Sequence, residues 1–286
     1  MKSFGVPDPH YVVARGVLLD ALEALGEQRE AIIVVGAQAI YLHTGAADLA
    51  VPEFTTDADL TIDPALLHES PELGSAMRAA HFERGSRVGC WITYRDITGV
   101  RTKVEVDLMV PEAVGGAGRR AARLPGHSRE VARKARGLEA ALVDKATTTI
   151  TALDPADQRS VAVAVAGPAA LLIAKLHKIA ERASERSPRR LDDKDALDIL
   201  RLLQAIETSQ LAEAFLRILE ADLATGVARD AIGILRAQFG DPRAAGSQMA
   251  VRAVGALMLA DEIAQSCSVL ASDLLRALDA RIRGLR

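Results

Sequence analysis

The stretch of sequence that decides the fold reads FTTDADLTI, at residues 54–62. A β-strand is predicted at residues 58–62, where apolar residues alternate with polar ones before Pro64 stops the strand. Alternate side chains of a strand point to the same side, so Asp57 and Asp59 share one face. Two carboxylates this close repel each other, and leaving them unpaired in a half-buried strand is costly. A divalent cation removes the conflict, because Mg²⁺ takes oxygen ligands. A chance Asp-x-Asp at a strand start is the alternative.

A second predicted strand, at residues 102–110, adds support for a metal site. Its apolar positions alternate with Lys103, Glu105 and Asp107, which therefore share a face. If this strand neighbours the first, Asp107 supplies a third carboxylate. Glu105 is its competitor on the same face, and spacing alone does not choose between them. Three carboxylates can hold two Mg²⁺ ions about 4 Å apart, which is a clamp for phosphoryl or nucleotidyl transfer.

The segment upstream of these acids offers a possible phosphate site. Residues 31–35 read AIIVV, which predicts a strand buried on both faces, and Gly36-Ala37 follow at a strand-to-helix turn. Small residues at such a turn let the backbone approach a phosphate, and the start of the next helix offers unpaired N–H groups. Any tight turn between a strand and a helix favours glycine as well.

The rest of the chain predicts an α+β fold in two domains. A mixed sheet flanked by helices is expected in residues 1–166, and an all-α domain in residues 167–286. The other elements predicted in the first domain are a helix, a hairpin, an irregular stretch rich in Gly and Arg, and a strand, at residues 10–26, 87–110, 112–137 and 160–166. In the second domain, helices are predicted from Pro168 onward, with breaks near Thr208, Gly226, residues 240–242 and Gly246.

Composition excludes several classes of protein. The chain has 286 residues and a formal net charge of −3, which argues against a polybasic chain. Its two cysteines, Cys90 and Cys267, are far apart and are most simply buried small hydrophobes in a reducing compartment. Neither a secretory leader nor an apolar run of about 18–20 residues is evident. We therefore expect a cytoplasmic protein that does not use a membrane as a partner.

One local excess of positive charge stands out. Seven basic residues and one acidic residue, Glu130, lie between Arg119 and Arg136. Such an excess attracts a nucleic-acid backbone, although charge runs are more often solvated faces. The candidate nucleic-acid contacts are Arg119, Arg120, Arg123, Arg133 and Lys134.

The helical half adds a lysine to the candidate site. Lys175 and Lys178 lie one turn apart, and Lys175 has apolar neighbours that would bury its stem. A buried lysine needs a counter-charge, which a nucleoside triphosphate would provide. Asp195 and Asp198 share a helical face and could orient Lys175 or bind a metal-linked water. Their alternative role is to supply favourable negative charge at a helix N-terminus.

In order, these features resemble the DNA-polymerase-β-like nucleotidyltransferases. Within that superfamily the chain looks most like the AbiEii group, the nucleotidyltransferase toxins of bacterial toxin–antitoxin and phage-defence systems. The resemblance covers roughly residues 30 to 205. The matching stretches are the strand with Gly36-Ala37 and the helix after it, TTDADL at 55–60, VDL at 106–108, GPAALLIAKL at 167–176 and RRLDDKDALDI at 189–199.

The resemblance implies a reaction and its participants. An acceptor hydroxyl would attack the α-phosphate of an NTP and pyrophosphate would leave, with two Mg²⁺ ions as cofactor. The leading acceptor is the 3′ end of tRNA, and a cognate antitoxin is a plausible partner. Transfer to a protein or a small molecule, and a catalytically silent NTP- or RNA-binding regulator, are the alternatives.

The resemblance also implies roles for single residues. The metal ligands would be Asp57, Asp59 and Asp107. The helical domain would contribute Lys175 and Asp195 to the cleft, and Lys175 would bind the triphosphate. Thr55 would contact phosphate or order the loop. The implied NTP-binding set is Gly36, Ala37, Thr55, Thr56, Lys175, Asp195 and Asp198.

Overall fold

The computed structural model describes residues 7–45, 53–183 and 193–284. The chain divides into two compact units. The sheet unit comprises Met1–Tyr41, Pro52–Ala135 and Lys145–Ala166, and the helical unit comprises Leu42–Val51, Arg136–Asp144 and Gly167–Arg286.

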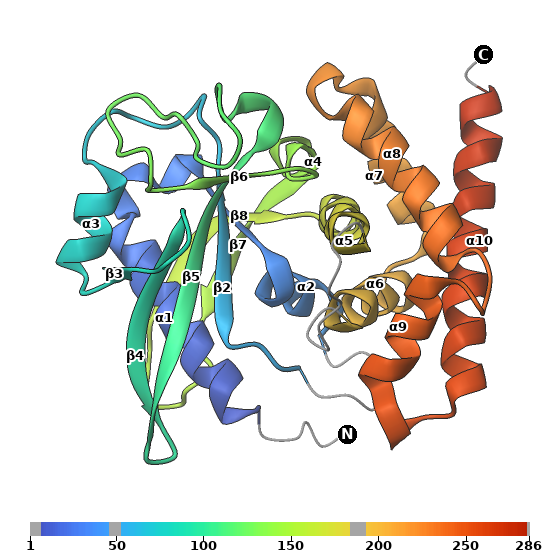
Figure 1. Ribbon diagram of the computed structural model, residues 1–286, viewed down its shortest axis with the longest axis horizontal. Helices are drawn as coiled ribbons and strands as arrows, with labels where there is room; N and C mark the ends of the chain where they lie inside the picture. Colours follow the sequence, from blue (N-terminus) through green and yellow to red (C-terminus); the bar gives the residue numbers. More distant parts are fainter. Residues whose placement is uncertain (1–6, 46–52, 184–192, 285–286) are drawn as a thin grey trace. The chain divides into compact units, whose positions relative to one another are not determined.

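The sheet unit contains a mixed sheet, with eight strands in its described residues (Figure 1). Seven of them follow the order β3-β4-β5-β2-β1-β8-β7, and β6 pairs with β5. The pairs β1–β8, β2–β5 and β5–β6 are parallel, and the other neighbours are antiparallel. The strands are β1 Ile32–Val35, β2 Asp57–Ile62, β3 Glu83–Arg84, β4 Cys90–Ile97, β5 Val100–Pro111, β6 Arg133–Ala135, β7 Lys145–Thr151 and β8 Ser160–Ala166.

The centre of this sheet is apolar because β1 is buried along its whole length. The neighbouring strand β2 alternates, so that Ala58, Leu60 and Ile62 are buried while the acidic positions lie on the other face. Burying each large aliphatic side chain of this core contributes about 1.5–3 kcal/mol. The acids of β2 are therefore held on a strand whose register is fixed by the core.

Helices flank the sheet. α1 (Pro9–Ala24) packs against β2, β4, β5 and β8. Asp8 caps the N-terminus of α1, and its carboxylate accepts a hydrogen bond from the His10 N–H at 2.8 Å. The other helical elements are α2 Gly36–Thr44 and α3 Leu73–Ala79, with short 3₁₀ turns at Gly26–Ala31 and Glu112–Val114.

The helical unit is built from helices that pack around an apolar centre including Phe215, Leu235 and Phe239. Its pairs include α5 with α6, α6 with α9, and α10 with α7, α8 and α9. The helices are α4 Glu139–Val143, α5 Pro168–Ala183, α6 Asp193–Ala205, α7 Thr208–Glu220, α8 Asp222–Phe239, α9 Ala245–Val254 and α10 Ala260–Gly284, with a 3₁₀ turn at Gly255–Leu257 (Figure 1). In the described part of the chain, no helix is long and apolar enough to cross a membrane.

The predicted α+β fold class is confirmed, and some predicted boundaries are wrong. Gly226 lies inside α8 and does not break a helix, whereas the predicted break near Gly246 is present, because α8 ends at Phe239 and α9 begins at Ala245. The break before α8 falls at Ala221, which has an extended backbone (φ −87°, ψ 111°). Tertiary packing outweighs the helix penalty of about 1 kcal/mol for an interior glycine.

Candidate active site

The acidic residues converge because β2 and β5 are parallel neighbours. Their register pairs Asp59 with Asp107 and Asp57 with Glu105. Residues paired in this way point to the same side of a sheet, so one face carries all four carboxylates. The sequence left open whether the two strands were neighbours, and the structure places them side by side.

The first two acids are held by the loop before β2 and by the turn after β1. The Thr55 hydroxyl donates to the Asp57 carboxylate, and Thr55 is fully buried. Thr56 is exposed. Gly36 has φ +72°, and a Cβ added there would lie 2.7 Å from Asp59 Cγ. Glycine is therefore required at this position for two reasons, the left-handed backbone and the close approach of the Asp59 carboxylate.

A buried polar network supports the start of β2. Gln38 Nε2 donates to the carbonyl oxygen of Asp57 at 3.0 Å and to that of Ala14 at 3.1 Å. Arg15 Nε in turn donates to Gln38 Oε1 at 2.9 Å, and Arg15 Nη2 donates to the Tyr11 hydroxyl at 2.8 Å. Burial raises the pKa of Tyr11 to about 12, so its hydroxyl stays protonated. Sequence reasoning missed this network because Arg15 lies on the predicted amphipathic helix without a distinguishing motif.

The third acid, Asp107, is surrounded by cations. Its Oδ2 accepts from Arg133 Nη2 at 3.1 Å, and its Oδ1 lies 3.8 Å from Arg87 Nη2. Arg87 also bonds Glu105 at 2.6 Å, and Lys103 pairs with the other oxygen of Glu105 at 2.7 Å. Burial raises the pKa of Glu105, but Lys103 and Arg87 outweigh it and hold that pKa below its usual range.

Two atoms of the Arg133–Asp107 ion pair are buried without a hydrogen-bond partner among the described residues. They are Asp107 Oδ1 and Arg133 Nε. An orphaned acceptor costs about 1–3 kcal/mol, and so does an orphaned donor. A cation at Asp107 and an anionic oxygen at Arg133 would satisfy both. The donor set on this face therefore fits a divalent cation together with a phosphate.

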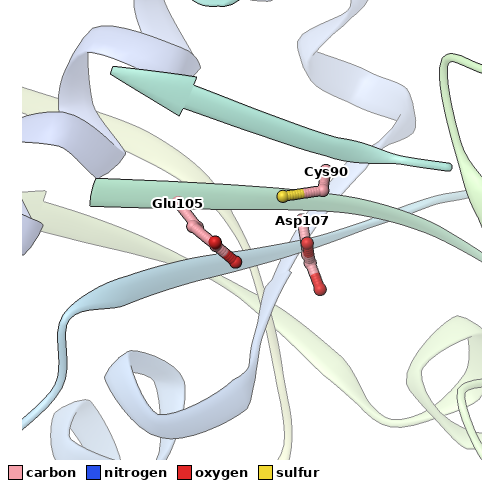
Figure 2. Close-up of side chains that lie close together, drawn as sticks. All are labelled: Cys90, Glu105 and Asp107. Carbon is pink, nitrogen blue, oxygen red and sulfur yellow. The ribbon is translucent and has the colours of Figure 1, made fainter. Parts of the chain in front are cut away.

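A cysteine joins the same face, and sequence reasoning missed it. The antiparallel pairing of β4 with β5 sets Cys90 opposite Asp107. One donor atom from each of Cys90, Glu105 and Asp107 lies within 4.8 Å of the others (Figure 2). Asp57 and Asp59 lie outside this tight group. The sequence could have placed Cys90 opposite Asp107 only through the register of the two strands. That register depends on the exact position of the hairpin turn, which the structure places at Thr98-Gly99.

Lys175 lies in the helical unit and has internal counter-charges. Its Nζ donates to Asp195 Oδ1 at 2.7 Å and to Asp198 Oδ2 at 2.6 Å, so the structure brings these three predicted residues together. Burial alone would lower the pKa of Lys175, but the two aspartates outweigh it and raise that pKa well above its usual value. The counter-charge that the sequence analysis sought in a triphosphate is thus supplied by α6.

The residues of the predicted basic stretch differ in their exposure and contacts. Arg119, Arg120 and Arg123 are exposed, whereas Arg133 is engaged by Asp107. Lys134 donates to the backbone carbonyls of residues 116 and 118. Residues 189–192 of the downstream motif lie outside the described residues.

Fold and site together define a class of protein: a mixed-sheet domain whose central parallel strands gather carboxylates on one face, with a glycine turn beside them. The chain belongs to the nucleotidyltransferase family, whose model matches residues 14–220. That match covers all of the strands and continues to the end of α7. Comparison with curated proteins gave no match to the chain.

Proposed function

We propose that this chain transfers a nucleoside monophosphate from an NTP to an acceptor hydroxyl, with release of pyrophosphate. The observation that carries the proposal is the parallel register that sets Asp59 beside Asp107, with Asp57 on the same face. Membership of the nucleotidyltransferase family supports it.

Asp57, Asp59 and Asp107 would hold Mg²⁺, with two ions as the working number. When bound, the metal neutralises charge on the phosphates during transfer. Asp107 Oδ1 supports this assignment, because this buried carboxylate oxygen has no hydrogen-bond partner among the described residues and lies 3.8 Å from Arg87 Nη2.

The remaining site residues would position the nucleotide. The backbone at Gly36 and Ala37 would approach a phosphate at the start of α2, where the first N–H groups of a helix have no partner within the helix. Thr55 would keep Asp57 in place through the hydrogen bond described above, and Thr56, which is exposed beside it, would contact the nucleotide. In nucleotidyl transfer, positioning and charge stabilisation supply most of the catalysis.

Lys175 stays a proposed contact of the triphosphate, which would have to compete with Asp195 and Asp198 for its amine. Its raised pKa keeps the amine charged, and Asp195 and Asp198 fix the direction in which it points. A lysine held in this way loses little side-chain entropy when it meets an anion.

The proposed acceptor is the 3′ end of tRNA, and the proposed role is that of an AbiEii-type toxin. The exposed arginines at 119, 120 and 123 support a polyanionic acceptor, because such a cluster attracts a phosphate backbone. A cognate antitoxin would then be the protein partner. A protein or small-molecule acceptor and a silent regulator are the competing functions.

The test is to incubate the protein with each of the four labelled NTPs and with total RNA, total protein or buffer alone. We expect label on RNA of tRNA size, which requires Mg²⁺. Asp59→Asn should lower the yield at least about 100-fold. Glu83→Gln, which changes an exposed acid of the same sheet, is the matched control and should transfer normally.

Label on protein would replace tRNA with a protein acceptor. Absence of label from RNA and protein with all four nucleotides would overturn the proposal and leave a small-molecule acceptor or the silent regulator. In cells, expression of the wild-type chain should arrest growth, and Asp59→Asn should relieve that arrest.

A further inference from the structure

We propose that Cys90, Glu105 and Asp107 form a second metal site, selective for a thiophilic divalent cation of the Zn²⁺ class. This site goes beyond the proposed transfer reaction, which needs only oxygen ligands. It rests on the geometry of β4 and β5 within the sheet unit.

The three donors come from a rigid part of the sheet. Cys90 begins β4 and pairs directly with Asp107 of β5, and Glu105 lies two residues earlier on the same face. Their donor atoms lie within 4.8 Å of one another, and Figure 2 shows the three side chains gathered at one place on the strands. Zn²⁺ bonds are roughly 2.0–2.3 Å long, so two ligand atoms of one ion lie at most about 4.6 Å apart, close to the spacing of these donors.

The guanidinium group of Arg87 lies close to all three donor atoms. Arg87 Nη2 lies 2.6 Å from Glu105 Oε2, 3.8 Å from Asp107 Oδ1 and 3.9 Å from Cys90 Sγ. The Arg87 side chain is 59% exposed, so it can swing into solvent when a metal takes its place.

Asp107 also has spare acceptor capacity beside the thiol. Asp107 is 9% exposed, and its Oδ1, which faces the Arg87 nitrogen near Cys90, has no hydrogen-bond partner within the described chain. The backbone of Gly85 also packs closely against the sulfur. A Cβ added at Gly85 would lie 2.8 Å from Cys90 Sγ, so a residue with a side chain there would crowd the thiol.

The donor chemistry selects the metal. A thiolate with two carboxylates suits Zn²⁺ and its thiophilic relatives, whereas Mg²⁺ takes oxygen ligands. A coordinating thiol loses its proton, so metal binding at Cys90 releases one proton to solvent.

Occupation of this site has a consequence for catalysis, and that consequence alone rests on the proposed function. Asp107 cannot serve both metal sites fully. A thiophilic cation would therefore withdraw Asp107 from the Mg²⁺ site and inhibit transfer, with Mg²⁺ and the inhibitor competing.

The test uses Cd²⁺ as a spectroscopic probe, because a cadmium–thiolate bond has an ultraviolet charge-transfer band that free thiols lack. The chain has only two cysteines, so each can be removed in turn. Cys267, buried in α10, is the matched control. Wild type and Cys267→Ala should show the band, saturating at one equivalent, and Cys90→Ser should not. Glu105→Gln should weaken Cd²⁺ binding at least about 10-fold.

Far-ultraviolet circular dichroism establishes that each variant is folded. A band that persists in Cys90→Ser, a band lost in Cys267→Ala, or no band in folded wild type would overturn the site. Inhibition is measured separately, as labelled transfer with and without Zn²⁺ relative to each variant's own metal-free rate. Wild type should be inhibited and Cys90→Ser should resist. The spectroscopic result stands even if no transfer activity exists, so the two failures are distinguishable.

Discussion

The buried charges of the helical unit should make Lys175 essential for its stability. Both aspartate partners of Lys175 are nearly inaccessible, with side-chain exposures of 4% for Asp195 and 1% for Asp198. Lys175→Met removes the amine and keeps a side chain of similar length. Two carboxylates would then remain in a low-dielectric interior without their main counter-charge.

The loss of unfolding free energy caused by Lys175→Met arises unequally from the two aspartates. Asp195 keeps Arg182 and Lys178, the latter at 3.4 Å. Asp198 loses the bond to Oδ2, and its Oδ1 already has no hydrogen-bond partner within the described residues. Removing one partner of a buried ion pair costs about 3–5 kcal/mol, and we expect most of that from Asp198. Lys175→Met combined with Asp198→Leu should recover most of the loss, because the pair is then replaced by apolar groups.

Denaturation by urea measures the effect. The single tryptophan, Trp91 in β4, reports the sheet unit, and far-ultraviolet circular dichroism reports mainly the helices. The loss of stability in Lys175→Met should appear in the transition followed by circular dichroism. Lys178→Met, which changes a half-exposed lysine, should cost less than about 1 kcal/mol. If Lys175→Met also costs less than about 1 kcal/mol, or the double variant fails to recover, the reasoning is refuted.

Further predictions concern the site and the response to acid. Gly36→Ala should lower transfer at least about 100-fold by displacing the Asp59 carboxylate, whereas Gly45→Ala, at φ +52° with open space around it, should not. Gln38→Leu should lower kcat more than it raises KM, because the carbonyl at the start of β2 loses its donor while no nucleotide contact is removed. Burial raises the pKa of Asp195, but Lys175, Lys178 and Arg182 outweigh it and hold that pKa below the ordinary 3.8. The stability this carboxylate contributes should be complete above about pH 4 and decline as the pH falls further, and acid titrations of Asp195→Asn should lack that decline.

Much of the sheet could be predicted because its strands have strong local patterns. The continuous apolar run of β1 and the alternation in β5 and β8 each specify a strand. By contrast, β7 has the sequence KATTTIT, in which most positions are exposed, and it forms by pairing with β8. Likewise, β6 is three residues long and depends on β5. The Thr and Ile residues of β7 favour a strand but give no alternating apolar pattern, and β6 is too short to give one.

In the candidate site, too, local patterns could be predicted and contacts between separate elements could not. Asp57 and Asp59 could be placed on one face from strand periodicity alone. Their meeting with Asp107 depended on which strands are neighbours, and the position of Cys90 depended on the hairpin register. The counter-charge of Lys175 required the packing of α5 on α6, which two amphipathic patterns do not specify.

The most direct test of the account is a titration with Mn²⁺, a paramagnetic substitute for Mg²⁺, followed by electron paramagnetic resonance with a non-hydrolysable NTP analogue present. Asp107→Asn should weaken Mn²⁺ binding at least about 10-fold, and Glu105→Gln, which changes the neighbouring acid on the same face, should bind as wild type. Wild-type affinity in Asp107→Asn would contradict the claim that Asp107 and Asp59 share a metal site. So would a loss confined to Glu105→Gln.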